Sequence, residues 1–194
     1  GQGDMDDRGD GSNEMGDNLT AIDLGSGRTA TSITTGTQYT CALLDDKSVK
    51  CWGRGDFYQL GNEKGANRGD NDDPNEMGDQ LEKVYLDSNS GDSFLRTATA
   101  IAAGNFHTCA IRDNSSIKCW GLNDSGQLGI VYESQHDSND GGPNNLLYLD
   151  RGSEVDLGAG RTARGIAAGD SHTCAMLDNA SIKCWGGNAF GQLG

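Results

Sequence analysis

Apolar positions in this chain come in short runs, each ended by a polar or glycine-rich segment. The runs Thr29–Gly36, Thr97–Gly104 and Arg161–Gly169 consist largely of small, β-compatible side chains. They lack the 3.6-residue period of an amphipathic helix, and they have the length of single strands. The pattern therefore predicts an all-β protein built of short strands and tight turns.

Each of these runs leads into a predicted hairpin. The next expected strand carries a cysteine, and the one after it carries Lys-Cys-Trp-Gly. A polar turn separates the two strands: Asp45-Asp46-Lys47, Asp113-Asn114-Ser115 and Asp178-Asn179-Ala180. A further leucine-bounded run predicts a fourth strand: Leu19–Leu24, Leu81–Leu86 and Leu146–Leu149. Four short antiparallel strands with glycine-rich turns describe one blade of a β-propeller.

These blades form three tandem repeats that fill the 194 residues. Each copy contains Thr-Cys-Ala, then Lys-Cys-Trp-Gly, and closes with Gln-Leu-Gly ending at Gly61, Gly129 or Gly194. A fixed internal repeat is the signature of a repeat architecture. We therefore expect one continuous repeat domain with units at residues 1–61, 62–129 and 130–194.

The cysteines fall into three pairs, each separated by ten positions: Cys41 and Cys51, Cys109 and Cys119, Cys174 and Cys184. Closing each hairpin around its three-residue turn places the two cysteines of a pair directly opposite each other, at a separation close to that of a disulfide. The spacing does not suit a zinc site, whose paired ligands usually lie two to four residues apart. We therefore predict three disulfides, no free thiol and an oxidising compartment.

The net charge and the lengths of the apolar runs argue against two classes of partner, nucleic acids and membranes. Lys and Arg number 15 against 29 Asp and Glu, which gives a net charge of −14. Such a charge repels nucleic acid and anionic lipid. The chain also has no run approaching the roughly 18–20 apolar residues of a membrane helix. We expect neither nucleic-acid binding nor a membrane span.

The repeated motifs resemble those of the regulator of chromosome condensation family. His-Thr-Cys-Ala, a polar turn, Ile-Lys-Cys-Trp-Gly and Gly-Gln-Leu-Gly are most similar to its cysteine-containing, alpha-tubulin-suppressor-like branch. The resemblance implies propeller blades, commonly seven to a ring, which three blades cannot close. Gly1–Asp4 is in phase with a repeat, without an initiating Met or a signal peptide. We therefore expect a fragment of a larger propeller, or an open or assembled array, whose secretion signal lies elsewhere.

Asparagine sequons suggest attached N-glycans. Four occur, at Asn18, Asn114, Asn123 and Asn179. Asn114 and Asn179 occupy the same predicted hairpin turn, where a glycan has room.

Two acidic loops are weak calcium candidates, because clustered carboxylates beside glycine turns can supply the oxygen ligands that calcium prefers. They end in the same Asn-Glu-Met-Gly-Asp and do not match the EF-hand spacing, so a solvated acidic loop is the favoured interpretation. The candidate ligands are Asp4, Asp6, Asp10, Glu14, Asp17, Asp70, Asp72, Glu76 and Asp79.

No catalytic constellation is visible in the sequence. His107 and His172 share a repeat position that Tyr39 takes in the first unit, so a structural role is favoured there. Three hypotheses remain for the function. The first is an extracellular, disulfide-stapled scaffold that binds protein, including further copies of itself, as part of a glycosylated filament or surface structure. The second is an intracellular propeller of guanine-nucleotide-exchange or ubiquitin-pathway type, and the third is a calcium-dependent carbohydrate-binding module.

Overall fold

The computed structural model describes residues 4–62, 65–70, 76–86, 96–130, 146–147 and 154–194. Its regular elements over these ranges are β-strands and two 3-10 turns, η1 (Gly16–Asn18) and η2 (Gly78–Gln80). The prediction of an all-β fold is confirmed.

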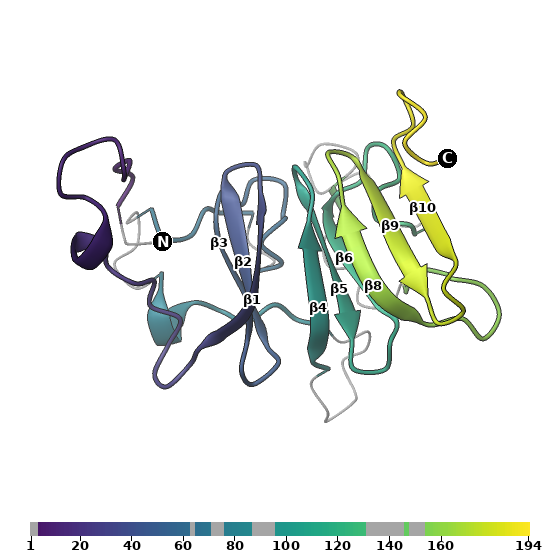
Figure 1. Ribbon diagram of the computed structural model, residues 1–194, viewed down its shortest axis with the longest axis horizontal. Coiled ribbons are helices and arrows are strands. Elements are labelled where there is room, and N and C mark those ends of the chain that lie inside the picture. The colour runs from purple at the N-terminus through teal and green to yellow at the C-terminus, as the bar shows by residue number, and fades with distance from the viewer. Residues whose placement is uncertain (1–3, 63–64, 71–75, 87–95, 131–145, 148–153) are drawn as a thin grey trace, which may run out of the picture.

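The strands form three antiparallel sheets that follow one another in a row (Figure 1). The first contains β1 (Ala30–Gly36), β2 (Tyr39–Leu44) and β3 (Val49–Gly53). The second contains β4 (Ala98–Ala103), β5 (His107–Arg112), β6 (Ile117–Leu122) and β7 (Leu146–Leu147). The third contains β8 (Ala163–Ala168), β9 (His172–Leu177) and β10 (Ile182–Gly186). Each sheet is a meander in chain order, as a propeller blade is.

Over the described residues, two of the sheets have three strands and one has four, so the expected four strands are found in the second sheet alone. In place of a full fourth strand, segment 81–86 runs beside β3 and forms an isolated bridge between Lys83 and Lys50. Leu146 and Leu147 pair with the C-terminal end of β6, at Leu122 and Gly121, and residues 148 and 149 of the expected strand lie outside the described ranges. In the second sheet, the counterpart of the contact in which Val84 N donates to the Val49 carbonyl is Val155, whose N–H donates to the Ile117 carbonyl. The outer segment thus pairs with the last strand of the preceding unit. Leu19–Leu24 forms no strand, because no sheet precedes it in the described part of the chain.

The hairpins close as the sequence predicts because their turns contain one residue in the left-handed region. Lys47, Ser115 and Ala180 have φ of 65°, 64° and 65°. The Asp or Asn before each one stabilises the turn by accepting hydrogen bonds from the serine two positions later, as Asn114 Oδ1 does from Ser116 N (3.1 Å) and Oγ (2.7 Å).

The hydrophobic core lies between consecutive sheets. One cluster combines residues of the first sheet with Ala98, Ala110 and Trp120 of the second. The other combines residues of the second sheet with Ala175 and Leu177 of the third. Because a sheet must bury its apolar face against another layer, each unit depends on its neighbour.

Candidate functional site

A disulfide joins the two hairpin strands in every sheet. Cys41–Cys51, Cys109–Cys119 and Cys174–Cys184 are bonded, with Cα atoms 4.1, 4.0 and 4.1 Å apart, and all six cysteines are used. The bonded residues face each other in the strand register, as the hairpin arithmetic requires. These bonds fix the register of the strands that form the junctions between sheets.

The junction between the first and second sheets centres on one backbone carbonyl. The Gln59 carbonyl accepts a hydrogen bond from Thr108 Oγ1 and another from Trp120 Nε1, each of 2.9 Å. Trp120 is almost completely buried, so its indole N–H needs this partner. The Trp120 of Lys-Cys-Trp-Gly therefore binds the neighbouring unit.

The second junction repeats the first. The Gln127 carbonyl accepts hydrogen bonds from Thr173 Oγ1 (2.9 Å) and Trp185 Nε1 (3.0 Å). A glycine two residues further on makes room for each indole: a Cβ on Gly129 would lie 2.6 Å from Trp185 Nε1. This steric need explains the glycine of the repeated Gln-Leu-Gly.

Tyr39 and His107, which share one repeat position with His172, also make contacts across a junction. Tyr39 Oη donates to the His107 carbonyl (2.6 Å), and His107 Nε2 lies 2.9 Å from Thr173 Oγ1. Burial, aided by the charge of His172, lowers the pKa of His107 to about 4. Burial likewise raises the pKa of Tyr39 well above its ordinary value. The Tyr39 and His107 side chains are therefore neutral structural groups at physiological pH.

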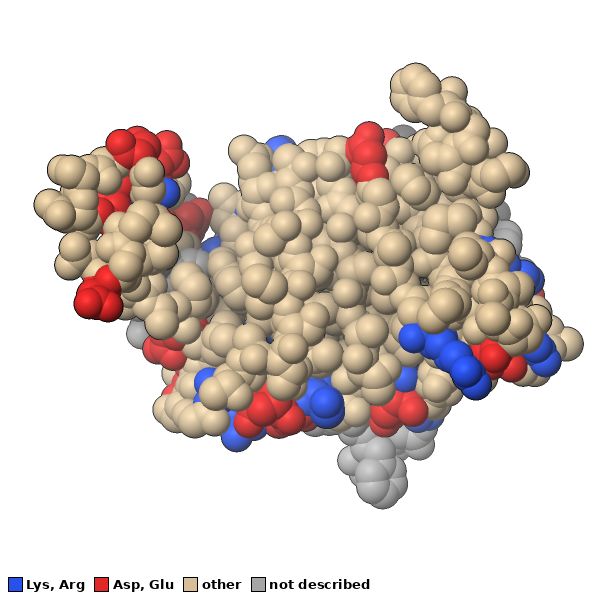
Figure 2. Space-filling view, in the orientation of Figure 1, with Lys and Arg blue, Asp and Glu red and all other residues tan. Residues whose placement is uncertain are grey.

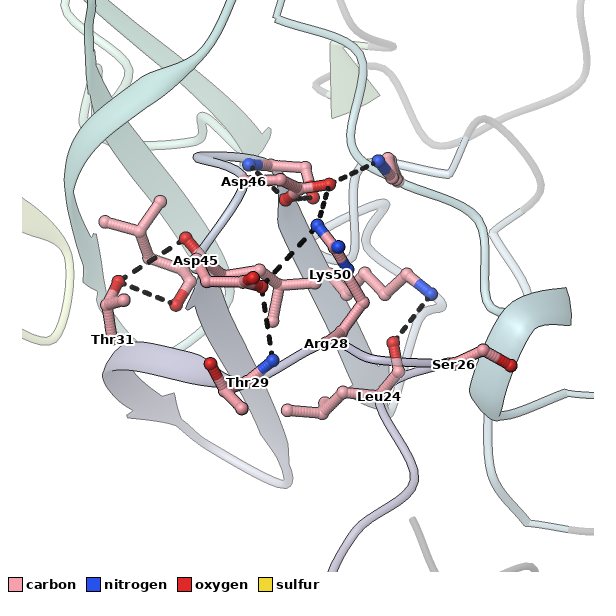
Figure 3. A network of polar contacts seen from close by, with 12 residues as sticks. Leu24, Ser26, Arg28, Thr29, Thr31, Asp45, Asp46 and Lys50 are labelled. Atoms are coloured by element: carbon pink, nitrogen blue, oxygen red, sulfur yellow. Dashed lines mark hydrogen bonds and ion pairs between the residues drawn. The ribbon is translucent and has the colours of Figure 1, made fainter.

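A second set of contacts joins residues 24–26 and 78–79 to each other and to Lys50 of the first sheet (Figure 3). The buried Lys50 ammonium donates to the carbonyls of Leu24 (3.0 Å) and Gly78 (2.7 Å). Burial lowers the pKa of Lys50. Asp79 accepts from Ser26 N (2.7 Å) and Oγ (2.6 Å), and these hydrogen bonds lower the pKa of its carboxyl.

Asp46 extends this network at the hairpin turn. Its carboxylate pairs with Lys83 (2.8 Å) and Arg28 (3.1 Å). Burial opposes its ionisation, but hydrogen bonds from Lys83 and Ser48 outweigh that cost and hold its pKa well below the usual range.

Charges collect at the borders of the sheets. Figure 2 shows a face that is largely uncharged in the middle, with most acidic and basic side chains along the lower edge and on the N-terminal segment. An arginine before each first strand pairs with the first aspartate of the hairpin turn: Arg28 with Asp45, Arg96 with Asp113, and Arg161 with Asp178. These ion pairs thus lie beside the hairpin turns.

In each acidic loop, a glutamate side chain accepts hydrogen bonds from backbone N–H groups of the same loop. Glu14 Oε2 accepts from the backbone N–H groups of Gly9 and Gly11, both at 2.8 Å, which lowers the pKa of Glu14. Glu76 accepts from Gly69 N (2.7 Å) in the equivalent loop. Over the ranges that the structure describes, no group of three or more Asp, Glu, His or Cys side chains is placed to hold a metal ion. Asp72 lies outside those ranges.

The four sequon asparagines occupy different settings. Asn18, Asn114 and Asn179 are exposed, the last two at matching hairpin turns. Asn123 is half-buried, and its Oδ1 accepts from Leu128 N (2.9 Å).

A comparison with known protein families identifies the three repeats. The regulator of chromosome condensation (RCC1) repeat matches residues 30–59, 98–127 and 163–192. These ranges contain the three-stranded meanders β1–β3, β4–β6 and β8–β10. The chain carries three RCC1-family repeats.

Over the described residues, none of its helices is long and apolar enough to cross a bilayer.

Individual relatives place these repeats inside longer proteins. Protein pim1 of Schizosaccharomyces pombe is 28% identical over 84% of this chain, which spans 26% of the relative. A human protein named as a probable E3 ubiquitin-protein ligase, HERC4, is 28% identical over 82% of this chain, which spans 12% of that protein.

A solved structure shows the same fold. The crystal structure of Prp20p from Saccharomyces cerevisiae superimposes with a TM-score of 0.60 at 21% identity, covering 81% of this chain and 33% of Prp20p. Prp20p is described with binding properties to Gsp1p and histones. This likeness shows that the three sheets share the fold of Prp20p.

The sequence alone did not reveal the junction acceptors, the carbonyls of Gln59 and Gln127. A backbone carbonyl has no sequence signature of its own. The available signal was indirect: Gln-Leu-Gly closes all three units, and the second and third tryptophans find their acceptors in those turns.

Proposed function

We propose that this chain is an extracellular, disulfide-stapled scaffold that binds other proteins through its stacked RCC1 repeats. The observation that carries the proposal is the cross-strand disulfide present in each of the three sheets. Disulfides of this density are typical of oxidising compartments and rare in the cytosol.

The small core supports the same proposal. Apolar residues make up 34% of the chain, and each sheet buries its side chains against its neighbour. A cross-link that closes a loop of this size contributes about 2–4 kcal/mol on the chain-entropy model. The staples therefore let thin sheets persist outside the cell.

Glycans on the hairpin turns are part of the proposal. Asn114 and Asn179 are exposed, so attached sugars would project from the ends of the second and third hairpins. Treatment of the native protein with an N-glycosidase should lower its mass and convert an occupied asparagine to aspartate. An unchanged mass would refute glycosylation.

Surface labelling of intact source cells tests the location. A membrane-impermeant amine reagent should label the lysines of this protein, and the chain should be recovered from the surface or medium fraction together with cross-linked neighbours. Recovery only from the cytosolic or nuclear fraction, with thiols open to alkylation, would overturn the extracellular proposal.

The relatives favour a second candidate, an intracellular scaffold of exchange-factor or ubiquitin-pathway type. HERC4 is named as a probable ubiquitin ligase, and Prp20p is described with binding to Gsp1p and histones. Nucleotide release from a small GTPase loaded with fluorescent GDP separates the two candidates. Acceleration by the reduced chain would favour the exchange-factor function, and an unchanged rate would favour the extracellular scaffold.

A further inference from the structure

The two junctions between sheets share their backbone contacts but differ in the side chains that close them. Both use a carbonyl of a closing turn as the acceptor for a threonine and a tryptophan. Both also join the turns between the first two strands of each sheet: Thr37 N donates to the Asn105 carbonyl, and Asn105 N to the Asp170 carbonyl, each at 3.1 Å. Each junction lies between two sheets of this chain, so the two are comparable position by position.

The first junction adds an aromatic cluster. Phe57, in the turn that follows β3, and Phe106, in the turn between β4 and β5, have ring centroids 4.7 Å apart. The Arg54 guanidinium lies 5.2 Å from the first ring centroid and 5.3 Å from the second, and Asp56 holds it by two hydrogen bonds of 2.7 Å. Aromatic pairs and cations over aromatic rings attract each other beyond the effect of the area that they bury. This cluster therefore joins the first sheet to the second.

The second junction has different residues at these positions. Ser125 and Ser171 take the places of the two phenylalanines, and Leu122 takes the place of the arginine. Serine has no ring and leucine has no charge. Neither the ring pair nor the cation–ring contact can form at the second junction.

A hydrogen bond between neighbouring first strands is also specific to the first junction. Thr34 Oγ1 in β1 accepts from Ala103 N in β4 at 3.0 Å. The equivalent residues of the second junction are Ala102 in β4 and Ala168 in β8. Ala102 presents a methyl group where Thr34 presents a hydroxyl, so it accepts no hydrogen bond from its side chain. The β4 strand is thus tied to β1 by a contact that β8 cannot make with β4.

The disulfides leave the junctions as the places where the row of sheets can open. Each disulfide cross-links the second and third strands of one sheet, and all six cysteines are used in this way. The hairpins therefore stay closed when two sheets separate. Units that contact only their neighbours open as cooperative blocks, beginning where the contacts between them are fewest.

We infer that the second junction is the hinge of the row and opens while the first and second sheets stay packed together. The Gln127 carbonyl then separates from Thr173 and Trp185, whereas the matching contacts of Gln59 persist. The inference goes beyond the proposed function, because it names the place at which a scaffold of stacked repeats changes shape. It holds in either compartment, so its failure would leave the proposed location untouched.

Hydrogen exchange of the purified, oxidised chain, followed by mass spectrometry, tests this inference. In the wild-type chain, the amides of β8–β10 should exchange faster than those of β1–β3. The triple substitution Leu122→Arg, Ser125→Phe and Ser171→Phe places the cluster of the first junction in the second, where Asp124 already stands at the position of Asp56. This variant should slow exchange in β8–β10 by about tenfold.

The reverse change removes the cluster from the first junction. Phe57→Ser combined with Phe106→Ser should speed exchange in β1–β3 by about tenfold. Tyr85→Ser is the matched control, because it removes an aromatic side chain that is 56% exposed and lies in neither of the turns that form the cluster. Its exchange rates in β1–β3 and β8–β10 should equal those of wild type.

Two results would overturn the inference. One is a wild-type chain whose β1–β3 amides exchange as fast as those of β8–β10, or faster. The other is a triple variant that has the circular dichroism spectrum of wild type and exchanges in β8–β10 within about twofold of the wild-type rate. If the triple variant does not fold, the double variant decides, and an unchanged rate in its β1–β3 strands would overturn the inference.

Discussion

Buried polar residues decide how neighbouring units recognise each other. Thr108, Thr173 and His107 are completely buried and form hydrogen bonds across a junction. Leaving a buried polar group without its partner costs more than the bond itself contributes, so these side chains penalise a wrongly packed junction.

Lys50 and Lys183 form a matched pair for testing this view. Lys50→Met leaves the carbonyls of Leu24 and Gly78 without their donor, so the free energy of unfolding should fall by about 1–3 kcal/mol. Lys183→Met removes an exposed ammonium and should change it by less than about 0.5 kcal/mol. Urea denaturation in dilute solution measures both. Equal losses would contradict the role assigned to Lys50.

The low pKa of His107 predicts that the free energy of unfolding falls in mild acid. The folded state keeps this imidazole neutral down to pH about 4, whereas the unfolded chain takes up the proton near pH 6.5. Between those values the unfolded state binds more protons, so the free energy of unfolding falls as the pH falls, by up to about 3 kcal/mol in total.

His107→Tyr supplies the control, since Tyr39 fills the same position in the first unit. Its stability should be flatter than that of wild type between pH 6.5 and pH 4. Parallel curves from thermal melts across this range would show that His107 does not titrate as described.

At the scale of the element, the hairpin was predictable and the outer segment was not. The ten-residue cysteine spacing and a three-residue turn leave one register, and Cys41 faces Cys51 in it. The partner of an outer segment belongs to another unit, so local pattern does not reveal it. The short β7 and the isolated bridge at Lys83 show how little regular pairing that segment makes. Its hold comes instead from Lys50, Asp79 and Val84, which local sequence does not connect.

Two glycines in the turns that close the units should differ in how strongly alanine at each position destabilises the protein. Gly61 and Gly126 have φ of 69° and 79°, so alanine at either site incurs about 1–2 kcal/mol of left-handed strain. A Cβ at Gly61 would also lie 2.8 Å from a Val84 methyl and 2.9 Å from Trp120 Nε1, whereas nothing lies within 4 Å at Gly126. Thermal melts should therefore show Gly61→Ala to be the more destabilised by at least about 1 kcal/mol. Equal melting temperatures would contradict the close packing of the junction.

For the whole molecule, three units in one row share two junctions of the same design. The repeat count, the strand order within hairpins and the cysteine pairing follow from recurring motifs. The junction carbonyls do not, because an acceptor such as the Gln59 carbonyl depends on the packing of a distant unit and on no side chain of its own. The domain boundaries at residues 61/62 and 129/130 stay predictions. The outer segments that follow these boundaries pair with the preceding sheet.

The cysteine pairing is the sharpest test of a stapled hairpin in every repeat. Native protein should be alkylated without reductant, digested and mapped by mass spectrometry. We expect three cross-linked peptides, Cys41–Cys51, Cys109–Cys119 and Cys174–Cys184, and no alkylated cysteine. Alkylation at three or more positions, or pairing between different repeats, would show that the hairpins are not stapled in this way.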